Sequence, residues 1–178
     1  MLMEEMTMSE TNKPAIKVFQ FHQEEFTFLG NENIITESSN FGEFWGNFFG
    51  IGGYDPILPY AKDTKPINVW YTNSAGENIY FQGLFVENVD KIPQGYKLVH
   101  FPASDFLVVT TEWMTTNDEA VGDNGNGRCN RYASTVEIPE GYVRNDGPGS
   151  LITGIEKENS NTPYGSRYEV WVPIKKFL

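Results

Sequence analysis

The sequence predicts an α+β fold in which an antiparallel sheet carries helices on one face. Three observations predict it: several short segments alternate with period two, one aromatic segment repeats with helical spacing, and the order of elements recurs in the two halves. A length of 178 residues fits one domain. We expect residues 1–13 to form a disordered tail and residues 14–178 to form that domain.

Four segments of the first half have the composition of strands. Ala15–Phe21 alternates apolar and polar residues, and Phe26–Leu29 is a shorter extended piece. Ile67–Tyr71 and Ile79–Val86 are separated by turn-forming residues, which predicts a hairpin.

A helix is expected between these pairs of segments. Asn40 is a suitable N-cap residue, because its side chain can accept hydrogen bonds from the first free backbone N–H groups. After it, aromatic residues recur at spacings of three and four, at Phe41, Phe44, Trp45, Phe48 and Phe49. The aromatic stripe would pack in the core, or one of its edges would line a ligand cavity.

The second half repeats this order less clearly. Its strands are expected at Tyr96–Phe101, Ser104–Thr111, Leu151–Lys157 and Tyr168–Ile174. Glu112–Tyr132 contains three glycines and is expected to be a long loop, with a short helix near 128–136. Ile92–Tyr96 reads Ile-Pro-Gln-Gly-Tyr and Ile138–Tyr142 reads Ile-Pro-Glu-Gly-Tyr, which indicates kinship of the halves or two similar turns.

The closing strand carries the main candidate site. Because side chains alternate along a strand, Tyr168 and Val170 share one face while Glu169 and Trp171 share the other. A carboxylate beside an indole suits an organic cation or a polar aromatic ligand. The alternative is a strand whose Glu169 simply faces water.

Composition limits the partners. A formal net charge of −11 disfavours direct binding to nucleic acid or to anionic membranes. The single cysteine, Cys129, has no nearby histidine and cannot form an internal disulfide, which fits the reducing cytoplasm. Neither a signal peptide nor a membrane-spanning run is apparent, and the histidines and acidic residues have no metal-ligand spacing. We expect a cytoplasmic protein without metal or cofactor.

Three segments carry a family resemblance. They are Tyr80–Val86, then Ile92–Tyr96 leading into Phe101–Val109, and finally Ile155–Asn159 followed by Tyr168–Ile174. With these motifs the chain resembles the gyrase-inhibitor-like (GyrI-like) small-molecule-binding domain, the effector-binding domain of AraC- and MerR-type transcription regulators.

The resemblance implies two β-α-β-β modules in pseudo-twofold arrangement, with a pocket between them for drug-like, often cationic or aromatic molecules. The family's pocket carboxylate corresponds to Glu169. The chain departs from the family pattern at residues 122–127, where a regular helix would be expected. No helix-turn-helix pattern is apparent, so the resemblance implies a separate ligand-binding protein that acts in drug sensing or transcription regulation, with a regulator protein as a further partner.

These expectations define a candidate pocket and three functions. The pocket residues are expected to be Glu169, Trp171, Trp70, Tyr71, Tyr80, Trp45 and Phe48. The first function is the binding of hydrophobic, cationic or aromatic ligands. The second is a hydrolase of small electrophiles, with Glu169 as general base and a tyrosine hydroxyl as donor. The third is a protein-interaction module, which would have an exposed apolar patch and no cavity between its halves.

Overall fold

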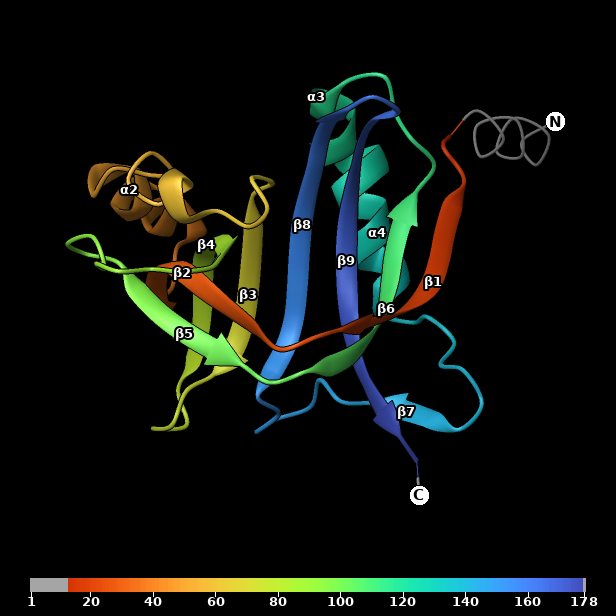
Figure 1. Cartoon of the computed structure of the whole chain (residues 1–178). Helices are drawn as coiled ribbons and strands as arrows, with labels where there is room; N and C mark the ends of the chain where they lie inside the picture. Colours follow the sequence, from red (N-terminus) through yellow and green to blue (C-terminus); the bar gives the residue numbers. More distant parts are fainter. Residues whose placement is uncertain (1–12, 178) are drawn as a thin grey trace, which may run out of the picture.

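The structure, a computed structural model, describes residues 13–177, so the predicted tail lies almost entirely outside the described residues. It is a nine-stranded antiparallel sheet in the order β1-β6-β9-β8-β3-β4-β2-β5, with β7 paired to β9 (Figure 1). The α+β class with an open antiparallel sheet is confirmed. The strands are β1 (Ile16–Gln23), β2 (Phe26–Ile34), β3 (Ile67–Thr72), β4 (Asn78–Val86), β5 (Lys97–Phe101), β6 (Ser104–Thr111), β7 (Tyr142–Arg144), β8 (Ile152–Thr162) and β9 (Gly165–Lys176).

Two units of the same strand order form the sheet. In the first unit β4 lies between β2 and β3, and in the second β9 lies between β6 and β8. In each unit, the last of the three strands along the chain is therefore the central one. The units meet through the antiparallel pair of β3 and β8. The pseudo-twofold relation itself stays a prediction.

The outer strands are exchanged between the units. The strand predicted at the start of the chain forms β1, yet it pairs with β6 of the second unit, from Ile16 opposite Thr111 to Gln23 opposite Ser104. In return, β5 pairs with β2 of the first unit. The first unit therefore begins at β2, and not at the first strand of the chain as the sequence alone suggested.

Helix α2 (Phe41–Gly50) confirms the predicted aromatic helix. Asn40 caps it, and its Oδ1 accepts hydrogen bonds from the backbone N–H groups of Gly42 at 2.8 Å and Glu43 at 3.3 Å. Phe48 is completely buried against Leu29 of β2 and Leu84 of β4. The glycines lower the intrinsic stability of this helix, and the packing of its aromatic side against the sheet offsets that loss.

The long loop expected at residues 112–132 is wrong, whereas the short helix expected near 128–136 is confirmed. This segment contains α3 (Asn117–Val121), a π-helical turn η2 (Asp123–Gly127) and α4 (Arg128–Ala133). Thr116 caps α3: its hydroxyl accepts from the Glu119 backbone N–H at 3.2 Å and donates to the Glu119 carboxylate at 3.0 Å. Gly125 permits the turn, because a Cβ there would lie 2.1 Å from the Ala120 carbonyl oxygen. Two further departures are β7, which was not expected, and β8, which continues to Thr162, beyond the strand expected at Leu151–Lys157.

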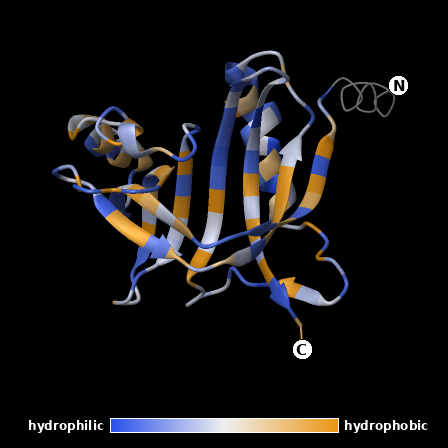
Figure 2. Cartoon of the chain, in the orientation of Figure 1, coloured by the Kyte–Doolittle hydropathy of each residue, from blue (hydrophilic) through white to orange (hydrophobic). Residues whose placement is uncertain are grey.

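The two faces of the sheet have separate cores. On the helix-covered face, α2 packs on β2 and β4, while Cys129 and Ala133 of α4 pack on Val170 and Val172 of β9. On the open face, aromatic side chains from both units form one cluster that includes Phe28, Phe81 and Trp171. Figure 2 shows the resulting alternation of hydrophobic and hydrophilic residues along strands such as β1. No helix among residues 13–177 is long and apolar enough to cross a membrane.

Candidate functional site

Strand β9 presents a buried carboxylate to the open face of the sheet. Strand β9 lies between β6 and β8, with Trp171 opposite Val108 of β6 and Ile155 of β8. Tyr168 and Val170 point to the helices, as the alternation predicts. Glu169 is 5% exposed and Trp171 4% exposed, so the alternative in which Glu169 faces water is wrong.

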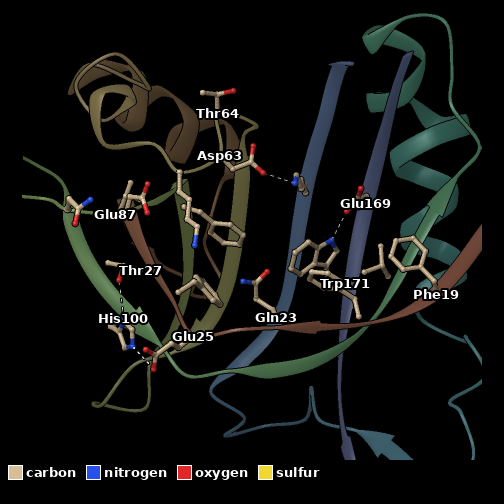
Figure 3. Close-up of a pocket in the computed structure, with 18 residues that line it drawn as sticks. Phe19, Gln23, Glu25, Thr27, Asp63, Thr64, Glu87, His100, Glu169 and Trp171 are labelled. Atoms are coloured by element: carbon tan, nitrogen blue, oxygen red, sulfur yellow. Dashed lines mark hydrogen bonds and ion pairs between the residues drawn. The ribbon is translucent and has the colours of Figure 1, made fainter. Parts of the chain in front are cut away.

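Beside these residues the open face is hollowed into a groove of about 910 Å³. Figure 3 shows Glu169, Trp171 and Phe19 on one side and Asp63, Glu87 and His100 on the other. Residues of both units form the walls. An interaction module was expected to have no cavity between its halves, and that expectation is wrong. The lining residues are Phe19, Phe21, Gln23, Glu25, Phe26, Thr27, Lys62, Asp63, Thr64, Phe85, Val86, Glu87, Asn88, His100, Val108, Lys157, Glu169 and Trp171.

Both oxygens of the Glu169 carboxylate have partners. The Trp171 indole N–H donates to Oε1 at 3.0 Å, and the Asn159 side-chain amide donates to Oε2 at 3.1 Å. The Arg167 Nε lies 3.6 Å from Oε2. Hydrogen bonds to a charged acceptor hold its position more firmly than bonds between neutral groups. The carboxylate is therefore fixed at the wall of the groove.

The groove carries an excess of negative charge. Four carboxylates line it, at Glu25, Asp63, Glu87 and Glu169, against two lysines. Lys157 is already paired with Asp63, at 2.7 Å between Nζ and Oδ2. The field of such a cleft favours a cationic ligand over an anionic one.

Aromatic rings supply the apolar surface beside Glu169. The Trp171 ring centroid lies 5.3 Å from that of Phe21 and 5.4 Å from that of Phe106. Phe26 and Phe85 form a second pair with centroids 4.7 Å apart. Because Phe21 of the edge strand β1 is partly exposed, its ring can stack on a bound molecule without rearrangement of the core.

The predicted pocket residues do not come together in one site. Glu169 and Trp171 line the groove. Tyr71 lies on the same face but packs in the core against Phe81 and Phe101. The other four lie on the helix-covered face: Trp70, Tyr80 and Trp45 line a different cavity, and Phe48 is in the core under α2.

Period-two alternation explains this separation. Trp70 and Tyr71 are neighbours on one strand, so they cannot point to the same face. The groove residues that the sequence did not single out include Phe19 and Phe21. Their alternation in β1 was visible, but the pairing of β1 with β6 was not. Asp63 belongs to a loop, and no local signal places it beside Lys157.

Two observations on residues 13–177 concern the catalytic groups and the metal ions that the site could use. No tyrosine is among the groove-lining residues, so the hydroxyl donor of the hydrolase alternative is not found there. Within residues 13–177, no group of three or more His, Cys, Asp or Glu side chains is placed to hold a metal ion.

No protein-family model matches the chain, and no curated protein matches its sequence. Solved structures share its fold. SAV2435 bound to tetraphenylphosphonium superposes with a TM-score of 0.66 at 12% identity, over 89% of this chain and 94% of that one. The C-terminal domain of EcmrR gives 0.53 at 10% identity, over 91% and 99%. EcmrR in a complex with DNA gives 0.53 at 9% identity, over 99% of this chain and 64% of that one.

These similarities establish the fold of the chain. The shared fold of SAV2435 and of the EcmrR C-terminal domain confirms the resemblance to GyrI-like effector-binding domains at the level of the fold. At identities of 9–12%, these similarities show the fold alone.

Proposed function

We propose that the chain binds hydrophobic organic cations in the groove on the open face of its sheet, with Glu169 as the anionic partner. The observation that carries the proposal is the carboxylate of Glu169, 5% exposed, at the wall of a groove that is rich in phenylalanine and negatively charged. The tetraphenylphosphonium bound to SAV2435, a protein of the same fold, supports the choice of ligand class.

The chemistry of the groove suits broad recognition. A cation near an aromatic face gains roughly 0.5–2 kcal/mol, and its attraction to a carboxylate strengthens once water is excluded. The Phe19 and Phe21 rings can contact ligands of different shapes, because they come from an edge strand and are partly exposed. This combination fits multidrug binding rather than recognition of a single metabolite.

The biological setting is proposed by analogy. EcmrR was solved in complex with DNA, and its C-terminal domain has the fold of this chain. We place the binding activity in drug sensing or transcription regulation in the cytoplasm, through a partner regulator rather than through direct contact with DNA.

The charge of Glu169 is testable by an isosteric replacement. Glu169→Gln should weaken binding of tetraphenylphosphonium by at least about tenfold, because the variant keeps the shape of the side chain but loses the buried negative charge. Isothermal titration calorimetry at constant ionic strength measures the dissociation constant, and tryptophan fluorescence gives an independent titration.

Glu140→Gln is the matched control. It removes the same charge from an exposed position that is not among the groove-lining residues, so the affinity should change less than about twofold. Equal affinities of the wild type and Glu169→Gln would overturn the cation site. Equal losses in both variants would assign the effect to net charge alone.

A further inference from the structure

A second cavity lies on the opposite side of the sheet from the groove. It has a volume of about 360 Å³ and is lined by residues of α2, of the α3–η2 segment and of the helix-covered face of β3, β4, β8 and β9. Glu156 and Glu158 of β8 point into it, while Ile155 and Lys157, which alternate with them along the strand, point to the open face. The sheet therefore separates this cavity from the groove.

An unpaired acceptor lies in the wall of this cavity. Asn68 of β3 is 9% exposed, and its Oδ1 has no hydrogen-bond partner. Gln82 lies directly opposite in the β3–β4 register, but its Nε2 is also unpaired, so the two amides do not satisfy each other. A buried polar atom without a partner costs roughly 1–3 kcal/mol, which a hydrogen-bond donor entering the cavity would recover.

Two carboxylates line the cavity beside Asn68, with neutral partners. Glu156 accepts a hydrogen bond from the Tyr168 hydroxyl, and Asn130 Nδ2 lies 3.4 Å from its Oε2. Glu158 accepts from Asn117 Nδ2 at 2.6 Å. No lysine or arginine is among the described lining residues. Burial raises the pKa of the Glu156 carboxyl above its ordinary value, because desolvation penalises the charged form; a cation beside it would lower the pKa again.

Aromatic rings form the remaining wall. The Tyr80 ring centroid lies 4.7 Å from that of Trp70 and 4.9 Å from that of Phe41. Trp45 of α2 donates a hydrogen bond to the Tyr80 hydroxyl, which links these two side chains of the cavity wall. Such a wall provides stacking and cation–π surface for a flat group.

We propose that this cavity is a second ligand site, for a small primary ammonium compound that carries an aryl group. The ammonium pairs with Glu156 and donates a hydrogen bond to Asn68 Oδ1, while the aryl group packs among Trp45, Trp70 and Tyr80. A primary ammonium meets both requirements, since it brings positive charge and N–H donors together. A volume of about 360 Å³ is at the low end for ligand sites, which suits an arylalkylamine rather than tetraphenylphosphonium.

Two related compounds separate the requirements. The probe is 2-phenylethylammonium, and the comparison compound is its N,N,N-trimethyl derivative, which keeps the charge but has no N–H donor. Calorimetry should show tighter binding of the primary ammonium by at least about fivefold. Glu156→Gln should weaken it by at least about tenfold, and Asn68→Ala should remove most of the preference over the trimethyl compound.

Glu140→Gln is the matched control, because it removes a carboxylate from an exposed position that lines neither the groove nor this cavity. It should leave binding of 2-phenylethylammonium within about twofold of the wild type. If Glu169→Gln in the groove abolished binding while Glu156→Gln did not, the amine would be in the groove and the second site would be overturned. No binding at millimolar concentrations would overturn it as well.

The four tryptophans locate the ligand without reliance on a variant's fold. Their indole N–H signals can be assigned in ¹H–¹⁵N spectra of the wild type and single Trp→Phe variants. Saturable shifts should appear at Trp45 and Trp70 on the helix-covered face. Shifts confined to Trp171, in the groove, would contradict the proposal. Because this site is independent of the proposed groove function, loss of tetraphenylphosphonium binding would not affect it.

Discussion

At the residue scale, the Glu169 carboxylate already has a cation beside it, and that cation would compete with a cationic ligand for the same negative charge. Arg167 lies on the same face of β9, with its Nε 3.6 Å from Glu169 Oε2. Its guanidinium stacks on the Trp113 ring, 4.2 Å from the centroid. The Nε makes no hydrogen bond, so the contact with Glu169 is a loose ion pair rather than a bidentate one.

Removing this internal cation should strengthen ligand binding. In Arg167→Gln the Glu169 carboxylate keeps the hydrogen bonds from Trp171 and Asn159 but loses its competing positive charge. We expect tetraphenylphosphonium to bind about fivefold more tightly, equivalent to about 1 kcal/mol. Calorimetric titration at low and high salt checks the value and its electrostatic origin.

Arg131→Gln provides the comparison. Arg131 is paired with Asp123 at 2.7 Å on an exposed surface, away from the groove, so its removal should change the affinity little. Weaker binding in Arg167→Gln would show that the arginine supports the site instead of competing with the ligand.

At the element scale, two glycines allow β2 and β4 to approach closely. Gly30 and Gly83 are directly opposite each other in the register of this pair. A Cβ on Gly83 would lie 2.1 Å from the Leu29 carbonyl oxygen, and one on Gly30 would lie 1.9 Å from that of Gln82. Side chains cannot be accommodated there, because the obstructing atoms belong to the backbone.

Gly83→Ala should therefore destabilise the whole domain. The added methyl group forces β2 and β4 apart, and we expect the free energy of unfolding to fall by about 3 kcal/mol or more. Urea denaturation followed by tryptophan fluorescence measures the change. Gly154→Ala in β8 is the control, since a Cβ there meets no atom within 4 Å and should leave stability nearly unchanged or slightly improved. Similar midpoints for the two variants would contradict the steric argument.

Local pattern predicted most elements and failed on their pairing. The repeat from Phe41 to Phe49 predicted α2 with its Asn40 cap, and the alternation of β9 correctly placed Glu169 and Trp171 on one face. These features depend on neighbours in sequence. The exchange of β1 and β5 between units depends on pairing between residues more than sixty positions apart in the sequence, which no periodicity encodes.

The same distinction explains the errors within the candidate site. The helix α3 could have been found, because Thr116 and Glu119 have the Thr-x-x-Glu spacing of a capping box. Tyr80 and Trp70 could have been assigned to a face other than that of Tyr71 by alternation alone. That Glu156 and Asn68 face one cavity could not have been predicted, since it requires the register of β3 against β8.

At the scale of the whole molecule, the sheet places acidic residues in hollows on both faces. Glu169 on the open face has Arg167 as a nearby cation, whereas Glu156 on the helix-covered face is hydrogen-bonded to the neutral side chains of Tyr168 and Asn130. Figure 2 shows the segment of β8 beside α3 as hydrophilic although a helix covers it. A chain with a net charge of −11 thus keeps a partly buried carboxyl group at a cost to its stability, which is expected where a ligand supplies the missing charge.

This cost should appear in the pH dependence of folding. The pKa of Glu156 is raised in the folded protein, mainly by desolvation, above an ordinary value of 4.5. The folded state then binds a proton more tightly than the unfolded state. The contribution of Glu156 to the free energy of unfolding is therefore most favourable below pH 4.5 and is lost as the pH rises through the folded pKa. The other groups that face this carboxyl are the Tyr168 hydroxyl, the Asn130 amide, Glu158 and Asn68.

Glu156→Gln isolates this contribution from all other titrations. The difference in unfolding free energy, variant minus wild type, should increase with pH from 4.5 to 8, by about 1.4 kcal/mol for each unit by which the folded pKa exceeds 4.5. Urea titrations at several pH values measure this difference, and Glu140→Gln at an exposed position should give a flat profile. A difference that falls with pH would mean that the carboxylate of Glu156 is stabilised in the folded protein, and that the cavity already contains its positive partner.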